Sequence, residues 1–540
     1  MFEGGIFLSH PLILLLKRVV KMAATVILLI VFFAVMIGIG AYCRKHSTDV
    51  NGFVLGGRSV GPWLTAFAYG TSYFSAVIFV GYAGQFGWKF GISSTWIGIG
   101  NALIGSLLAW VVLGRRTRLM TQHLSTDTMP SFFEKRFSSK GLKIGAAVII
   151  FIFLIPYTAS LYNGLSRLFA MAFPGFDYAW CVIVMAVLTC IYVTAGGYMA
   201  TAINDFIQGI IMLVGIVMVI AAVISSHGGF SASLAELASV SDPEASNVSG
   251  VFNSFFGPEP LSLLFVVILT SLGTWGLPQM VQKFYAIKSE KDIHKGTVIS
   301  TLFAVIVAGG CYFLGGFARI AQSPEAVAAS GYDSIIPQMM SEIPDILIAV
   351  VIILVLSASM STLSSLVLAS SSTLTLDFID GNICKKMSQK SKVLTMRVFI
   401  VVFIAISAVI AIVQEKMKVA FIAQMMGISW GALAGAFLAP FLYSLYWKGV
   451  TKAAVWTSYV FGVGIMCLGM INSNCANFLG LPSFWMSPIN LGVLSMLAGL
   501  VIVPVVSLIT KKPERKVIDK AFECYDEKVL VSAKNSLSDD

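Results

Sequence analysis

Residues 66–75 read AFAYGTSYFS and residues 270–278 read TSLGTWGLP, and both segments interrupt long apolar stretches of the chain. A helix that breaks inside a bilayer leaves backbone amides and carbonyls without partners, which is tolerated only where they line a cavity or bind a ligand. The two breaks therefore mark a candidate site. Glycine and proline also produce simple kinks in membrane helices, so each break alone has a structural explanation as well.

Lipid is the solvent that the composition implies. The chain has 540 residues, of which 57% are hydrophobic and 11% are charged, and this is too apolar for a water-soluble surface. Because a bilayer core of about 30 Å needs about 20 helical residues, we expect an all-α integral membrane protein with about thirteen transmembrane helices. They begin near Ala23, Pro62, Gly91, Leu142, Tyr178, Ala202, Leu261, Gly296, Ile343, Val398, Ala420, Ala453 and Ser487.

Paired broken helices in two halves of a chain are typical of transporters built from inverted repeats, which hold solute and ion near the bilayer midplane. We therefore predict two five-helix repeats separated by an external loop. The predicted parts are a first transmembrane helix (22–43), the first repeat (62–225), the external loop (226–255), the second repeat (256–446), two accessory helices (447–510) and a cytoplasmic tail (511–540).

The basic residues predict the orientation in the cell membrane. With the N-terminus outside and the C-terminus in the cytoplasm, 28 of the 36 Lys and Arg residues fall in cytoplasmic segments, as the positive-inside rule requires. The net charge of +10 is thus spread over loops, and no single patch suggests nucleic acid. The six cytoplasmic segments are 44–61, 115–143, 283–295, 380–397, 447–452 and 511–540.

The N-terminal extension, residues 1–21, does not fit this orientation. Lys17, Arg18 and Lys21 would lie outside, directly before the first membrane helix. Either translation starts at Met22, or these residues form an interfacial amphipathic stretch.

Residues 357–365, which read SASMSTLSS, carry the clearest chemistry. The hydroxyls of Ser361, Ser364 and Ser365 share one helical face, and Thr362 lies beside it. A sodium ion is a hard cation that prefers several oxygen ligands. Small hydroxyl residues also let membrane helices pack closely, so the segment alone indicates either an ion site or close packing.

Asp205 opens an otherwise uncharged apolar stretch. A carboxylate at membrane depth is costly and usually functional. An acid at the start of a helix can instead act as its cap, and the sequence leaves both explanations open.

These segments resemble the sodium:solute symporter family, especially its sodium/proline and sodium/pantothenate branches. The resemblance runs from about Gly56 to Trp447, and it rests on GGRSVGPW at 56–63, GGYMATAINDFIQ at 196–208, GLPQ at 276–279 and MSTLS at 360–364.

The resemblance implies sodium as the coupling ion, with no other cofactor, and it assigns three sets of residues. A main sodium site would use carbonyls of Thr71, Phe74 and Ala358 and hydroxyls of Ser361 and Thr362. A second sodium, which some members carry, would use Asp205, Ser361, Ser364 and Ser365. The solute would lie near Ser75, Tyr157 and Trp275.

The solute is less well defined than the ion. Tyr73 stands where proline carriers have an aspartate, and Thr270 and Thr274 stand where they have aromatic residues. The stretch 151–158 lacks the arginine that would pair with a sialic-acid carboxylate. We expect import of a small organic solute, first an amino acid such as proline, with pantothenate or another monocarboxylate as the alternative.

Two other classes of membrane protein fit less well. A channel would need a pore lined by carbonyl or charged rings, and no repeated filter is visible. An enzyme would need a nucleophile and base or a metal cluster, yet the five histidines lie at chain ends or in loops. We therefore expect no enzymatic activity and no obligate protein partner.

Overall fold

The computed structural model describes residues 10–173, 175, 177–243, 245–341, 344–384, 387–417, 422–474, 477 and 479–526. Within these ranges the chain is helical, and its β pairing consists of three isolated bridges. Residues 1–9 of the predicted extension, 527–540 of the predicted tail and the predicted helix starts at Ile343 and Ala420 lie outside the described residues.

The first half of the chain contains the first broken helix. Its two helical parts are α3 and η3, with residues 74 and 75 between them. The helices are α1 (His10–Cys43), α2 (Val50–Leu55), α3 (Pro62–Tyr73), η3 (Val77–Tyr82), α4 (Ala83–Phe90), α5 (Thr95–Gly100), η5 (Asn101–Leu108), η6 (Trp110–Gly114), α6 (Arg115–His123), α7 (Met129–Phe137), α8 (Lys140–Ala172), α9 (Tyr178–Ser226) and α10 (Phe230–Ser239).

The second half contains the second broken helix, α11–η8–α12, which bends by 49°. Its helices are α11 (Pro260–Leu272), η8 (Gly273–Gly276), α12 (Pro278–Ala286), α13 (Glu290–Gly315), α14 (Ala318–Ala321), α15 (Pro324–Ser330), α16 (Ile335–Ser341), α17 (Asp345–Thr373), η10 (Leu374–Ile379), α18 (Gln389–Met417), α19 (Ile422–Tyr446), α20 (Lys452–Asn474), α21 (Ser483–Met486), α22 (Pro488–Ile509) and α23 (Arg515–Asp526).

Ten helical segments among the described residues are long and apolar enough to cross a membrane, or eleven if the bent pair is counted. Two of the ten, Val77–His123 and Tyr178–Ser226, have 47 and 49 residues. At about 1.5 Å per residue each is more than twice as long as a bilayer core of about 30 Å is thick. The prediction of an all-helical membrane protein is confirmed.

Both long segments turn at a glycine. Gly91 has φ +64° and Gly197 has φ +57°, a region that other residues rarely adopt. At Gly197 a Cβ atom would also lie 2.8 Å from the Phe53 carbonyl oxygen. These glycines change the direction of the chain without an intervening polar loop.

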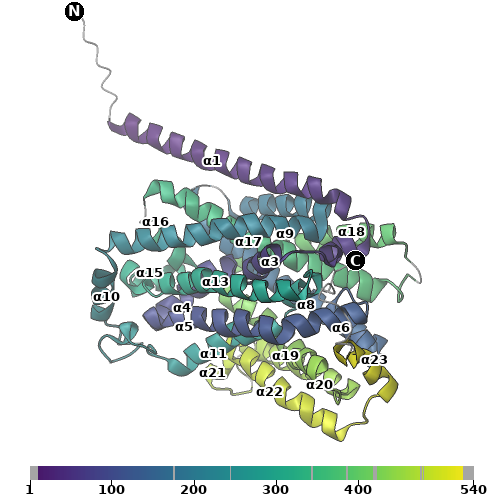
Figure 1. Cartoon of the computed structure of the whole chain (residues 1–540). Coiled ribbons are helices and arrows are strands. Elements are labelled where there is room, and N and C mark those ends of the chain that lie inside the picture. Colours follow the sequence, from purple (N-terminus) through teal and green to yellow (C-terminus); the bar gives the residue numbers. More distant parts are fainter. Residues whose placement is uncertain are drawn as a thin grey trace, which may run out of the picture.

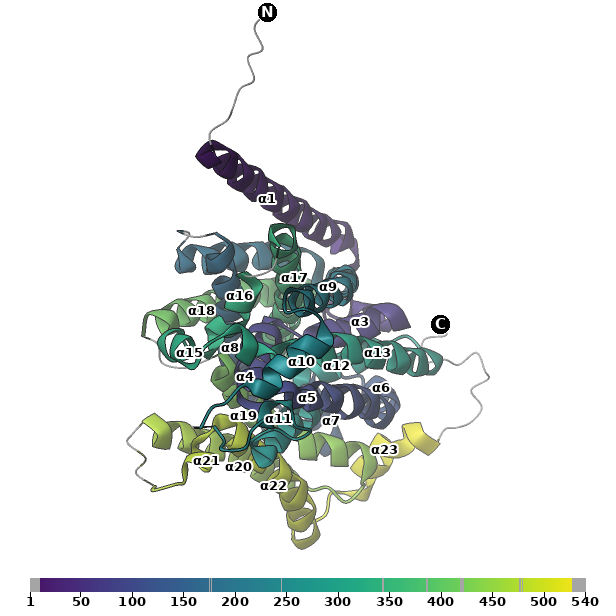
Figure 2. The same ribbon diagram turned by 90° about the vertical axis from the view of Figure 1, so that its left-hand side faces the viewer.

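The helices that carry the site lie in the middle of the molecule. α3 packs against α9, α13 and α17, while α19 packs against α8, α20 and α22. Figure 1 and Figure 2 both show α1 on one side of this body and α20 with α22 on the opposite side. The first part of the first broken helix, α3, is thus surrounded by longer helices.

The outer helices expose apolar side chains. Val398, Val401, Val409 and Val413 of α18 are 46–59% exposed. A surface of this kind is unfavourable in water and favourable in lipid, so the fold has the surface of a membrane protein.

The segment 56–63 joins the start of α3 to the end of α12. Gly56, Gly57 and Arg58 all have positive φ, which turns the chain sharply before α3. The Arg58 guanidinium donates to the carbonyls of Thr126 at 2.5 Å and Tyr285 at 3.3 Å. A backbone bridge between residues 60 and 287 then joins the start of α3 to the end of α12.

Candidate ion and solute site

The first break lies at Phe74, where the backbone is extended with φ −102° and ψ 103°. An extended residue at this point prevents the preceding carbonyls from accepting the usual helical amides. The last turn of α3, which includes Thr71, therefore presents its carbonyls to the neighbouring helix. That neighbour is α17.

Four of the five residues predicted for the main sodium site meet here in direct contact. Ser361 Oγ lies 3.0 Å from the Thr71 carbonyl oxygen and 3.2 Å from that of Ala358. Thr362 Oγ1 lies 3.1 Å from each of the same two carbonyls. The fifth residue, Phe74, lines a cavity of about 10 Å³ together with Ala358.

These oxygens suit a small monovalent cation. The hydroxyls of Ser361 and Thr362 donate to carbonyls, and a hydroxyl that donates keeps lone pairs that a cation can share. The ligands are neutral dipoles and all are buried. Within the described part of the chain, no cluster of three His, Cys, Asp or Glu residues offers a site for a multivalent metal.

Asp205 is a buried carboxylate, which is one of the two explanations that the sequence left open. It is fully buried in the middle of α9, so it is no helix cap. Its Oδ2 lies 3.8 Å from the Nζ atom of Lys283 on α12, and that side chain is only 3% exposed. Lys283 was counted among the cytoplasmic loop residues, and that assignment is wrong because α12 carries it into the protein interior.

The serines predicted for a second sodium are divided between two surroundings. Ser365 Oγ accepts a hydrogen bond of 2.9 Å from Lys283 Nζ and lies 2.8 Å from Ser72 Oγ. Ser364 Oγ donates to the carbonyl of Ser361, one turn back on the same helix. The structure thus brings Asp205 and Ser365 together through Lys283, with Ser364 bonded to its own helix.

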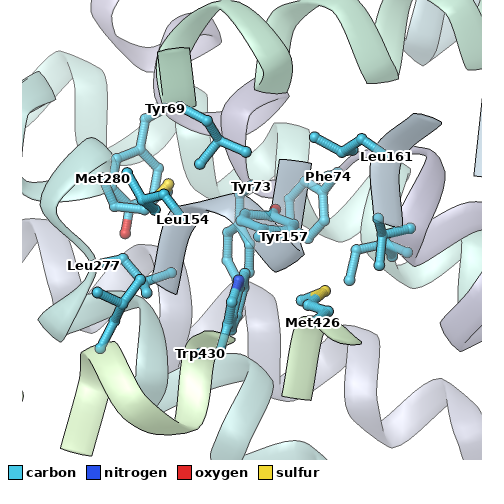
Figure 3. Close-up of a cluster of buried hydrophobic side chains, with 14 of the residues drawn as sticks. Tyr69, Tyr73, Phe74, Leu154, Tyr157, Leu161, Leu277, Met280, Met426 and Trp430 are labelled. Atoms are coloured by element: carbon cyan, nitrogen blue, oxygen red, sulfur yellow. The ribbon is translucent and has the colours of Figure 1, made fainter. Parts of the chain in front are cut away.

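The predicted solute residues Ser75 and Tyr157 lie in one buried aromatic cluster. The Tyr157 ring packs edge to face against the Trp430 ring, with 5.9 Å between the ring centroids. The centroid of the Tyr73 ring lies 6.1 Å from that of Trp430. Figure 3 shows these three rings gathered between α3, α8 and α19. The Ser75 and Tyr157 hydroxyls and the Trp430 indole nitrogen are buried with no partner at ideal hydrogen-bond geometry, and the Tyr157 hydroxyl interacts with the other two groups.

Trp275, the third predicted solute residue, has a different orientation. Its indole nitrogen donates to the Ile104 carbonyl in η5 at 3.0 Å. The 3-10 turn η8 places this side chain against η5. Tyr73 donates to the carbonyl of Thr270, so this tyrosine also links the first broken helix to the second.

Sequence reasoning missed two residues of the site, Lys283 and Trp430. Lys283 begins the segment 283–295, which is rich in charged residues, and Trp430 is one aromatic residue among many in an apolar helix. The sequence did contain an indication that Lys283 lies on a buried helix, because apolar residues at helical spacing lie on both sides of it in α12.

Known proteins with similar sequences are transporters. The family model for the sodium:solute symporter family matches residues 53–462. The osmoregulated proline transporter OpuE of Bacillus subtilis is 30% identical over 494 residues, which is 90% of this chain and 94% of the relative. A sodium/proline symporter of Staphylococcus aureus is 31% identical over 517 residues, covering 91% and 93% of the two chains.

A solved structure has the same fold. The substrate-bound outward-open state of a Na⁺-coupled sialic acid symporter superposes with a TM-score of 0.69, 16% identity and coverage of 91% of this chain and 98% of that one. The family model spans most of the chain, including both broken helices and the contacts between α3 and α17. This chain belongs to the sodium:solute symporter family.

Proposed function

We propose that this symporter imports a small amino acid, proline in the first instance, together with sodium bound between α3 and α17. The observation that carries the proposal is the placement of the Ser361 and Thr362 hydroxyls on the carbonyls of Thr71 and Ala358. The proline-transporter relatives support this choice of solute.

Sodium in this position would couple the ion gradient to the movement of helices. An ion shared by α3 and α17 stabilises the state in which these two helices are in contact, and its release frees them to separate. A sodium ion that enters down a potential of 100 mV gains about 2.3 kcal/mol, before any concentration gradient. That free energy would then drive solute accumulation.

The aromatic cluster supports an amino acid or another monocarboxylate as the solute. Ser75, Tyr157 and Trp430 offer three buried donors, and none of them is charged. A carboxylate can accept from such donors while a sodium ion nearby balances its charge. The rings of Tyr73 and Trp430 would contact the apolar part of a small solute such as a pyrrolidine ring.

Uptake into proteoliposomes tests the proposal directly. We expect proline to accumulate against its gradient when an inward sodium gradient is imposed, and not when potassium replaces sodium. Pantothenate and other monocarboxylates are compared under the same conditions. Accumulation of pantothenate in place of proline would change the solute and keep the mechanism, whereas flux that never exceeds equilibrium would indicate a channel.

The solute site yields a prediction for Tyr157. Tyr157→Phe removes one donor and keeps the ring, and a hydrogen bond to a charged group is worth about 1.5–3 kcal/mol. We expect the KM for solute to rise about tenfold or more, with the sodium dependence unchanged in initial-rate uptake measurements.

Tyr162→Phe is the matched control for this experiment. Tyr162 lies on the same helix, is equally buried and also has a hydroxyl without a hydrogen-bond partner, but it lies outside the aromatic cluster around Trp430. Equal effects of the two substitutions would contradict the assignment of Tyr157 to the solute site.

We further propose the thirteen-helix topology, in which residues 62–123, turning at Gly91, and Tyr178–Ser226, turning at Gly197, each cross the membrane twice. An odd number of crossings places the two termini on opposite sides, with the basic loops and the tail in the cytoplasm. A reporter fused after Asp540 should be cytoplasmic, and one inserted near Ser246 should be external. Location of both reporters on the same side would contradict this topology.

A further inference from the structure

We propose that the Lys283 ammonium is a built-in cation at the second ion position, so that this carrier binds one sodium ion per transport cycle. The inference rests on the proposed function, because it concerns the stoichiometry of the same sodium-coupled transport. It replaces a mobile second ion beside Asp205 with a side chain that never leaves the protein.

The contacts of Lys283 are those that a bound cation would make. Its Nζ atom lies 3.8 Å from Asp205 Oδ2, 2.9 Å from Ser365 Oγ and 5.2 Å from the centre of the Tyr198 ring. These are a carboxylate, a hydroxyl and an aromatic face, all of which attract a positive charge. Asp205 and Ser365 are two of the residues that the sequence assigned to a sodium ion.

The charge balance of this buried pair leaves no place for a further cation. Asp205 and Lys283 together have zero net charge, whichever of them holds the proton. Within the described residues each has the other as its ion-pair partner. A sodium ion at Asp205 would lie next to the ammonium in a region with almost no solvent, where like charges repel strongly.

Lys283 is also linked to the main sodium site. Ser365, which accepts its hydrogen bond, lies one helical turn beyond Ser361 and also bonds to Ser72. Ser72 directly follows Thr71, whose carbonyl receives the Ser361 and Thr362 hydroxyls. The chain from Lys283 through Ser365 to Ser72 therefore holds both broken helices on α17, and Lys283 acts as a positioning residue for the main site.

The sodium-to-solute ratio of the wild-type protein is the first test. We expect a ratio of one from reversal potentials in proteoliposomes and a Hill coefficient of one for sodium in uptake. A wild-type ratio of two would overturn this inference and leave sodium coupling intact. Solute accumulation that does not depend on sodium would instead overturn the proposed function, so the two failures are distinct.

Lys283→Met provides the second test, because it keeps the length of the side chain and leaves the Asp205 carboxylate without its cation. We expect sodium to take the vacated position, so the ratio should move from one toward two and the Hill coefficient should rise. A variant that transports with the wild-type ratio and Hill coefficient would overturn the inference.

The double variant Asp205→Asn/Lys283→Met is the matched control. It removes both charges, so the ratio should return to one. If the single variant fails to reach the membrane, the wild-type ratio still decides, because a ratio of two in the wild-type protein contradicts a position already filled by Lys283.

Discussion

Replacing Ser361 and Thr362 together by alanine should raise the sodium concentration for half-maximal uptake at least tenfold, equivalent to about 1.4 kcal/mol. These two residues would supply the side-chain oxygens of the proposed main site, and their hydroxyls lie 3.0–3.2 Å from the carbonyls of Thr71 and Ala358. Backbone carbonyls alone would leave a small cation with fewer ligands than it prefers. The measurement is initial uptake as a function of sodium concentration, with the amount of protein in the membrane held equal.

Two variants on the same helix separate ion binding from packing. Ser359→Ala removes a buried hydroxyl that donates to Val355 of its own helix, so the sodium dependence should stay as in wild type. Thr362→Ser keeps the oxygen and loses only a methyl group, so it should bind sodium far better than the double variant. Unchanged sodium dependence in the double variant would rule out the assigned site.

The residues proposed for the main ion site could be grouped from sequence because they lie in local motifs. Ser361 and Thr362 lie on one turn of one helix, and Thr71 lies directly before a break that is visible in the sequence. Only one long-range contact, between α3 and α17, could not be read from these local motifs. The family resemblance implied that contact, and in the structure the Ser361 and Thr362 hydroxyls lie at hydrogen-bond distance from the Thr71 carbonyl.

Lys283 and Trp275 illustrate what sequence could not provide. Lysine is rarely buried without a partner, and the partner of Lys283 is 78 positions away in the sequence, on α9. Trp275 lies in a 3-10 turn, where the direction of each side chain depends on how the turn begins. Its indole meets η5, a contact that no local pattern encodes.

Two tight turns, at Gly91 and Gly197, decide how the membrane crossings are counted. Apolar stretches predict thirteen, while helices that continue through a turn give ten or eleven long segments. The difference arises at Gly91 and Gly197, where positive φ changes the direction of the chain without a polar loop. The predicted helix starts at Gly91 and Ala202 lie at or close to these two turns, so the proposed count of thirteen takes each arm as a separate crossing.

The pairing of Asp205 with Lys283 has an energetic consequence for coupling. Two unit charges about 4 Å apart interact by about 4 kcal/mol at an effective dielectric constant of about 20. The charge movement of one sodium ion down 100 mV gains only about 2.3 kcal/mol. The Lys283 ammonium therefore offsets the attraction of the Asp205 carboxylate for a second ion by more than the electrical driving force supplies, whereas the proposed main site, built from neutral oxygens, has no such neighbouring cation.

Gly197→Ala should abolish most of the correctly folded protein. Gly197 has φ +57° and ψ −152°, a conformation that is essentially restricted to glycine and costs other residues about 1–3 kcal/mol. The added Cβ would also lie 2.8 Å from the Phe53 carbonyl oxygen and 2.9 Å from the Phe53 ring. Both costs act at the turn that positions Asp205, eight residues further along α9.

We expect at least a tenfold decrease in monodisperse protein after detergent extraction, measured by fluorescence-detected size exclusion of a C-terminal fusion. A conformational cost and a steric cost combine here, and together they are a large part of the about 5–15 kcal/mol that stabilises a typical domain. Gly464→Ala is the matched control, since this glycine lies in α20 with no atom within 4 Å of an added Cβ. Wild-type yield and stability of Gly197→Ala would show that α9 tolerates a continuous helix here, and the double crossing of Tyr178–Ser226 would then be wrong.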